Sequence, residues 1–172
     1  MIACLKGHIE IVKLLLESGR EIDINKGNDG KTPFYTACQE GYIGITKLLL
    51  NDQRLDKTQT ENDYWASFWM ACYDGNLEIV NLLLNNERVD RNKANKKKES
   101  PLYIACQNGH IDIVKLLLND KQISIRKEIK KGKTALDIAK EENHSNIVEL
   151  IQEFDTGRFN SGVKVNYRYF KQ

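Results

Sequence analysis

One interval governs this sequence, because near-identical segments recur every 34 residues. Residues 35–52 read YTACQEGYIGITKLLLND, and residues 103–120 read YIACQNGHIDIVKLLLND. Alanine keeps this register along the chain, at Ala3, Ala37, Ala71, Ala105 and Ala139. A fixed period of this length is typical of stacked repeats, in which one small unit packs on the next. We therefore interpret the 172 residues as about five copies of one unit.

Within one repeat, the sequence predicts two short helices joined by a tight turn. Ser100 suits an N-cap, and Pro101 suits the first helical position, where its missing N–H costs nothing. Gly109 suits the turn, which often needs a positive φ. A second helix is expected from about Ile111 to Leu118, because its apolar residues follow helical spacing. The polar linkers are too long for simple turns, so we expect projecting fingers or hairpins at 17–31, 51–65, 85–99 and 119–133.

The segment GKTPFYTACQEGYIGITKLLL, residues 30–50, resembles an ankyrin repeat in its opening, its glycine turn and its second helix. The resemblance covers residues 1–152, in five registers that stay in phase. It implies an all-α fold, an ankyrin-repeat solenoid of stacked helix–turn–helix units with projecting finger or hairpin loops. The third unit departs from the pattern. It reads DYWASF where DGKTPF is expected, so the second finger lacks both its glycine and its proline.

The predicted organisation is an array over residues 1–153 and an extended tail over 154–172. The array comprises a partial repeat over 1–16, repeats starting near 32, 66 and 100, and a C-terminal capping repeat over 134–153. In the capping repeat, Lys140, Ser145 and Gln152 replace residues that are apolar in the other units. Terminal repeats need such a polar outer face for solubility.

The two ends of the chain give rise to two further expectations. Cys4, Ile9 and Leu16 are apolar residues of the interior type, and we expect them to lie next to no neighbour. The chain is accordingly expected to be the C-terminal end of a longer array. In the tail, apolar residues alternate with polar ones, which indicates an extended segment. Its apolar residues are expected to pack on the protein surface: Phe159, Val163, Val165 and Tyr167.

The positions of the cysteines and the hydropathy of the chain indicate which cellular environment the protein suits. The four cysteines each follow a register alanine, at Cys4, Cys38, Cys72 and Cys106. Equivalent positions in stacked helices lie about 8–10 Å apart, beyond the reach of a disulfide. We therefore expect buried thiols in a reducing compartment, the cytoplasm or the nucleus. No apolar run approaches the roughly 20 residues that a membrane span needs.

The sequence offers no candidate for catalysis. Its three histidines, His8, His110 and His144, occupy one repeat slot just after the turn residue, so we expect them to bond loop backbone. Neither a catalytic motif nor a pair of metal-ligating cysteines is present. The chain is therefore predicted not to be an enzyme, and no metal and no cofactor are expected.

The family resemblance implies that partners contact the finger tips and the exposed side of the first helices, which line a concave groove. Two readings of Trp65 stay open, either an anchor for a partner or a side chain that folds over its own finger. Trp69 is expected to serve helix packing. The residues predicted to bind a partner are Trp65, Tyr73, Asp63, Asp74, Lys96, Lys97, Gln107, Asn108, Lys130, Lys131 and Lys133.

Charge is unevenly distributed, with a balance of −4 over residues 1–84 and +6 over 85–172. A ridge that is basic at one end would steer a partner with an acidic segment.

We therefore predict a monomeric, non-catalytic protein–protein interaction module, a scaffold or adaptor. The alternative is nucleotide or nucleic-acid binding through the basic fingers with Trp65 and Tyr73, and a third reading is a structural spacer. The net charge of +2 makes nucleic acid the weaker prediction.

Overall fold

The computed structural model describes residues 2–28, 30–55, 60–87, 89–125 and 132–156, with positions 60–63 described as backbone only. These residues form consecutive helix pairs, and no strand occurs among them. The pairs are α1 (Ile2–Leu5) with α2 (Ile9–Glu17), α3 (Pro33–Gln39) with α4 (Ile43–Asn51), α5 (Thr60–Asp74) with α6 (Leu77–Leu84), α7 (Pro101–Gln107) with α8 (Ile111–Leu118), and α9 (Ala135–Glu141) with α10 (Ser145–Asp155). The predicted all-α repeat fold is confirmed.

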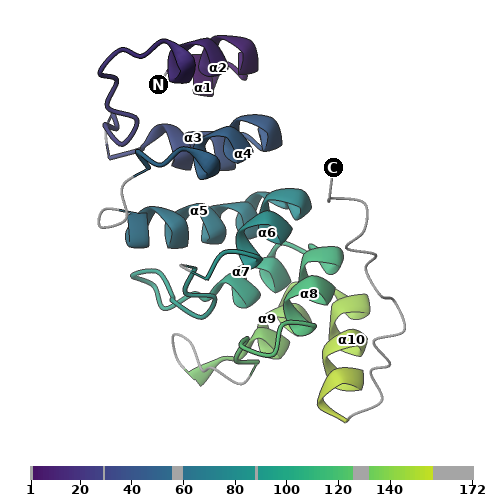
Figure 1. The fold of residues 1–172 in the computed structure, drawn as a ribbon. Helices are drawn as coiled ribbons and strands as arrows, with labels where there is room; N and C mark the ends of the chain where they lie inside the picture. Colours follow the sequence, from purple (N-terminus) through teal and green to yellow (C-terminus); the bar gives the residue numbers. More distant parts are fainter. Residues whose placement is uncertain (1, 29, 56–59, 88, 126–131, 157–172) are drawn as a thin grey trace.

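The helix pairs stack in chain order into an elongated solenoid (Figure 1). The first helices α1, α3, α5, α7 and α9 form one row, and each packs on the next. The second helices α2, α4, α6, α8 and α10 form a parallel row in the same way. Residues 34 apart therefore meet equivalent surroundings, except in the two end repeats.

A glycine ends the first helix in each of four repeats and takes a left-handed conformation. The φ angles of Gly7, Gly41, Gly75 and Gly109 lie between 70° and 81°. The next repeat also approaches this turn closely. A Cβ atom at Gly109 would lie 2.6 Å from the His144 ring, which is too close for a real contact. Glycine therefore permits both the turn and the stacking.

Hydroxyl side chains cap three of the first helices. Thr32, Ser100 and Thr134 each accept a hydrogen bond from the backbone N–H three residues on, at 3.1, 3.2 and 3.3 Å. The N-cap predicted at Ser100 is thereby confirmed. At Thr134 the cap is reciprocal, because its backbone N–H donates to the Asp137 carboxylate at 2.8 Å. The hydrogen bonds from Thr134 hold the pKa of Asp137 below its usual value.

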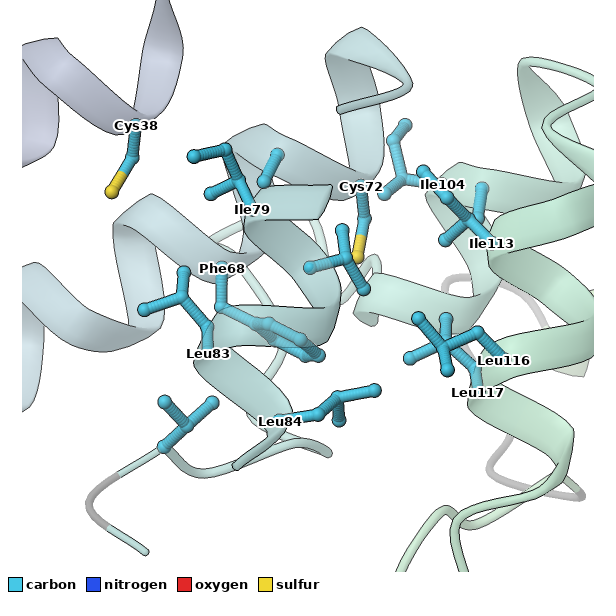
Figure 2. Close-up of a cluster of buried hydrophobic side chains, with 14 of the residues drawn as sticks. Cys38, Phe68, Cys72, Ile79, Leu83, Leu84, Ile104, Ile113, Leu116 and Leu117 are labelled. Atoms are coloured by element: carbon cyan, nitrogen blue, oxygen red, sulfur yellow. The ribbon is translucent and has the colours of Figure 1, made fainter. Parts of the chain in front are cut away.

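The core runs along the stack between the two helix rows. Figure 2 shows Phe68 and Cys72 of α5 among apolar side chains from neighbouring elements, including Ile104 of α7 and Ile113 of α8. All four cysteines are buried as free thiols, as the sequence predicts. Burial raises the pKa of Cys38 to about 12, so its thiol stays neutral and serves as a small packing residue.

The third repeat differs from the others in its first helix. Where α3, α7 and α9 have seven residues, α5 has fifteen and begins at Thr60. The second linker, expected to form a finger over 51–65, therefore ends as helix. Tyr64 fixes this extension, because it is fully buried and its ring centre lies 5.0 Å from that of Phe34.

The N-terminal repeat is uncovered on a face other than the one expected. Cys4 is buried and Leu16 is half-buried against the second repeat. A Cβ atom at Gly44 would meet the Ile9 side chain at 2.5 Å, so Ile9 also faces that repeat. The expectation that these three residues lie next to no neighbour is wrong. Ile9 nevertheless stays 40% exposed, and the more exposed apolar side chains of this repeat include Ile2, Ile11 and Leu14.

The polar face predicted for the fifth repeat is confirmed, because Lys140, Ser145 and Gln152 are all exposed. Residues 157–172 lie outside the described residues. The packing expected for the tail side chains Phe159, Val163, Val165 and Tyr167 therefore stays a prediction.

Candidate protein-interaction surface

Of the residues predicted to bind a partner, those that the structure describes lie on or just after the first helices α5 and α7 and on the third and fourth linkers. We call the exposed side chains of α3, α5, α7 and α9, together with the residue that follows each helix, the first-helix surface. Tyr73 and Asp74 close α5, while Gln107 and Asn108 close the following first helix, α7. The two pairs are linked directly, because the Asn108 amide donates to the Tyr73 carbonyl at 2.8 Å.

Tyr73 is the most prominent apolar side chain of the first-helix surface. It is 45% exposed, and its ring stacks on that of Trp69 with centres 5.6 Å apart and planes 20° apart. Trp69 is half-buried against the core, and its indole N–H donates to the Glu99 carbonyl at 3.0 Å. The predicted packing role of Trp69 is therefore confirmed, but the residue also holds Tyr73 in place. The spacing of four residues on one helix is the sequence signal for this pair.

Several carboxylates act on tyrosines and on one another across the first-helix surface. Partial burial and the nearby Glu40 carboxylate raise the pKa of Asp74 above its usual value. Burial, followed by the charge of Asp74, also raises the pKa of Tyr35. The pKa of Tyr103 is raised by burial and then by the Glu99 charge. The middle of the first-helix surface therefore combines aromatic rings with ionised carboxylates that repel each other.

Trp65 lies in the added part of α5 and is held by the third finger, residues 85–99. Its indole N–H donates to the Lys93 carbonyl at 2.7 Å, and the Lys93 ammonium lies 5.1 Å from the centre of the indole ring. Trp65 is half-buried. Both contacts go to the following finger. Much of Trp65's own finger lies outside the described residues, so the reading that it folds over that finger stays a prediction.

The third finger presents lysines on a turn that is well fixed. The Asn95 carboxamide oxygen accepts from the backbone N–H of Lys97 at 2.9 Å and of Glu99 at 3.0 Å. Lys98 takes the left-handed conformation with φ 66°, and its N–H donates to the Asn95 carbonyl at 2.8 Å. Lys96 and Lys97 are thereby exposed on an ordered tip.

The remaining predicted site residues fall into two groups. The Lys133 ammonium pairs with the Glu141 carboxylate at 2.7 Å, which ties the end of the fourth linker to α9. This hydrogen bond raises the pKa of Lys133. The side chain of Asp63, and Lys130 and Lys131 entirely, lie outside the described residues, so their place in the site stays a prediction.

The histidines serve the stacking. The His110 imidazole contacts the Tyr73 carbonyl at 2.9 Å, and the His144 imidazole contacts the Gln107 carbonyl at 3.1 Å. Each ring nitrogen thus binds backbone of the preceding repeat, which confirms the predicted structural role for these two. Within the described residues, no three His, Cys, Asp or Glu side chains gather as metal ligands do. No described helix is both long and apolar enough to cross a bilayer.

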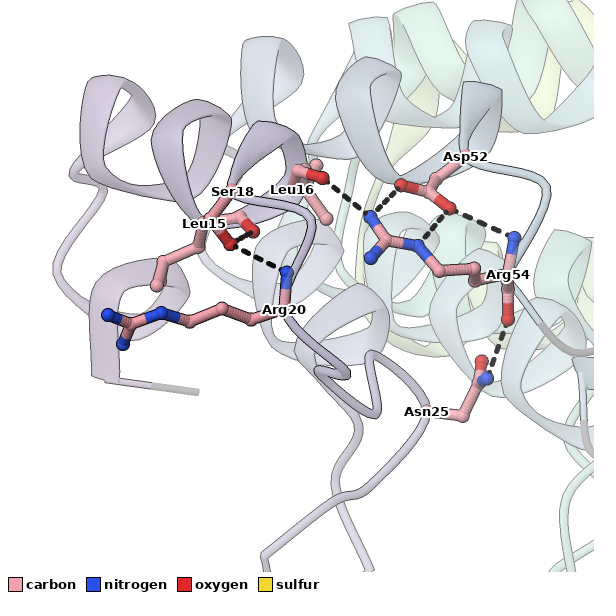
Figure 3. A network of polar contacts seen from close by, with 7 residues as sticks. All are labelled: Leu15, Leu16, Ser18, Arg20, Asn25, Asp52 and Arg54. Atoms are coloured by element: carbon pink, nitrogen blue, oxygen red, sulfur yellow. Dashed lines mark hydrogen bonds and ion pairs between the residues drawn. The ribbon is translucent and has the colours of Figure 1, made fainter.

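A polar cluster around Arg54, near the start of the stack, forms its hydrogen bonds within the protein (Figure 3). Arg54 forms a bidentate pair with Asp52, at 2.6 and 2.9 Å, and also donates to the Leu16 carbonyl at 3.0 Å. The Asn25 amide donates to the Arg54 carbonyl at 2.7 Å. Hydrogen bonding from Arg54 lowers the pKa of Asp52. These contacts join the first two linkers, so we assign the cluster to stacking rather than to a ligand.

Comparison with known proteins agrees with this geometry. A family model described as ankyrin repeats, in three copies, matches residues 1–61 and 68–161. Among curated proteins, none matches the chain. Ankyrin repeats are generally protein–protein interaction modules and typically act as non-catalytic scaffolds. With helix pairs in a fixed register and a family match over most of its length, the chain belongs to the ankyrin-repeat family.

Proposed function

We propose that this protein is a non-catalytic adaptor that binds a protein partner across its first-helix surface and finger tips. The observation that carries the proposal is the exposure of Tyr73 on its stacked Trp69 support. Among the described residues beyond the first repeat, it is the one large hydrophobic side chain that is exposed. Aromatic residues held rigidly at a surface are typical interface hot spots.

Charge suggests how a partner is oriented. Lys96 and Lys97 stand on the third finger, whereas Glu40 and Asp74 lie at the ends of α3 and α5. An acidic segment of a partner would therefore favour the finger tips and would be repelled from the helix ends. We propose that the partner places an acidic segment along the third and fourth fingers and a neutral or aromatic group on Tyr73.

The experiment begins with capture of partners from native lysate by the unchanged chain, followed by binding kinetics with the purified partner. Changing Lys96 and Lys97 to Glu should mainly slow association, because exposed charges act on diffusional encounter. The effect should shrink as salt is raised, since the screening length falls from about 10 Å at 0.1 M to about 3 Å at 1 M. Tyr73→Ala should instead speed dissociation.

The matched control carries the same change of charge elsewhere. Lys13 on α2 is exposed and Lys47 on α4 is partly exposed, and both lie on second helices, outside the first-helix surface and the fingers. Changing both to Glu should leave association nearly unchanged. A partner that binds equally well to the double reversal at Lys96 and Lys97 and to Tyr73→Ala would contradict the proposal.

The structure weakens the alternative of nucleic-acid binding. The Trp65 ring already carries the Lys93 ammonium over its face, and its N–H is engaged, so it offers no open platform for a base. Titration with a single-stranded oligonucleotide at several salt concentrations tests this alternative. A steep loss of affinity with rising salt, together with a loss in Tyr73→Ala, would favour it.

A further inference from the structure

The first repeat exposes an apolar face that every later repeat buries. Ile11 is 48% exposed, whereas the isoleucines in its slot are at most 1% exposed, at Ile45, Ile79, Ile113 and Ile147. Leu15 is 41% exposed, against at most 2% for the residues in its slot, Leu49, Leu83, Leu117 and Ile151. Ile2 and Leu14 are exposed as well. We call Ile2, His8, Ile11, Leu14 and Leu15 the rear face. It lies on α1, on α2 and on the turn between them, at one end of the stack (Figure 1).

The chain itself shows what covers this face in the later repeats, because the same interface recurs four times along the stack. Each time, the side chain in the His8 slot lies over the turn glycine of the preceding repeat. These pairs are Tyr42 over Gly7, Asn76 over Gly41, His110 over Gly75 and His144 over Gly109. In the last three, the side chain also contacts carbonyls at the end of the preceding first helix, as His110 does with Tyr73. The His8 imidazole is exposed and makes no hydrogen bond among the described residues.

We propose that the rear face binds a helix–glycine turn–helix unit of the kind that this chain repeats. The apolar side chains of the unit would cover Ile2, Ile11 and Leu15. The His8 ring would lie over the positive-φ glycine of the unit. The imidazole would donate a hydrogen bond to a backbone carbonyl at the end of the unit's first helix. This surface is separate from the first-helix surface and continues the interface already formed between successive repeats.

The structure argues against a second copy of the chain as the occupant. A copy stacked head to tail would present its fifth repeat, whose exposed Lys140, Ser145 and Gln152 are polar. That repeat also has Asn143 at the turn, with φ 60°, so a Cβ atom stands where the His8 ring would lie. A copy stacked rear face to rear face offers no glycine turn, because Gly7 faces the second repeat under Tyr42.

The test uses the full chain with a duplicate of its own residues 69–102 fused ahead of Met1. This segment contains a turn glycine and a second helix, and it ends in Ser100, Pro101 and Leu102, the residues that open α7. Amide hydrogen exchange in α2 is then compared with that of the unmodified chain. We expect exchange there to slow by at least about tenfold, because the rear face becomes buried. Unchanged exchange in α2 would overturn the proposal.

A pair of substitutions tests whether the duplicate protects α2 by docking its glycine turn against His8 or only by making the whole chain more stable. Gly75→Asn is made only in the duplicate, because Asn143 shows that asparagine tolerates this turn. The new Cβ atom would meet the His8 ring, as one at Gly75 would lie 2.8 Å from the His110 ring. Most of the protection of α2 should be lost, and His8→Ala should restore part of it. Full protection with Gly75→Asn alone would contradict the geometry proposed.

Sedimentation of the unmodified chain tests for a second copy. We expect a monomer, and a dimer that Ile11→Glu dissociates would show that a second copy is the occupant and would overturn the proposal. Ile11 is exposed, so this substitution should leave the fold intact.

Discussion

Each interface between repeats contains a matched pair of residues. One is the turn glycine of a repeat, and the other is the residue that follows the turn in the next repeat. Glycine supplies the left-handed turn and leaves room, and a ring or carboxamide of the next repeat fills that room. Asn143 keeps the turn but fills the space itself. At the scale of single residues, one Cβ atom thus decides whether the turn leaves room for a side chain of a following repeat.

Asp74 should reduce the stability of the fold at neutral pH. Its raised pKa means that the folded state binds a proton more readily than the unfolded state does. The ionised carboxylate therefore costs stability above the unfolded-state pKa of about 3.9, and the cost vanishes below it. Asp74→Asn should raise the free energy of unfolding at pH 7 and leave it unchanged near pH 3. Urea titrations at both pH values check this, and a loss of stability at pH 7 would contradict it.

Among the elements, α5 shows the largest difference between sequence and structure. The missing glycine and proline of DYWASF indicate that the usual turn is absent, but they do not say what replaces it. The helical extension depends on tertiary contacts, in which Tyr64 packs on Phe34 and Trp65 bonds the Lys93 carbonyl. Local propensity does not encode such contacts. Elsewhere the alanine register and the caps locate the helix pairs correctly, because each repeat meets the same neighbours.

The candidate surface was predictable in part, for a similar reason. Family resemblance and the repeat register place Tyr73, Gln107 and Asn108 together at the ends of first helices. The stacking of Tyr73 on Trp69, and the bond from Trp69 to the third finger, depend on side-chain rotamers that the repeat pattern does not specify.

Two indole N–H groups should hold the third finger against α5. Trp65→Phe removes the hydrogen bond to the Lys93 carbonyl, and Trp69→Phe removes the one to the Glu99 carbonyl. Each change should lower the free energy of unfolding by about 1 kcal/mol, the usual net value of one hydrogen bond. Amide exchange at residues 95–99 should rise in both variants, while exchange in α8 serves as the internal control. Unaltered exchange in the finger would show that these bonds do not hold it.

For the whole molecule, the position of a repeat in the stack should decide how much a given side chain contributes to the free energy of unfolding. The same isoleucine slot occurs in all five repeats, and its exposure is 48% at Ile11, 1% at Ile45, Ile79 and Ile113, and 0% at Ile147. Each repeat buries its rear slot against the one before it, so the fifth repeat is covered there and the first is not. The two ends of the stack therefore differ. The same substitution, made in each repeat in turn, should show which end has the uncovered slot.

Replacing each of these isoleucines by alanine in turn should give an uneven profile along the chain. Large-to-small changes at buried sites cost about 2–5 kcal/mol, and this range should apply to Ile45, Ile79, Ile113 and Ile147. Ile11→Ala should cost less than about 1 kcal/mol, because much of its side chain is already in water. Chemical denaturation of the five variants measures the profile. A cost at Ile11 equal to that at Ile79 would mean that the rear face is covered in solution, and a small cost at Ile147 would contradict the direction of the stack.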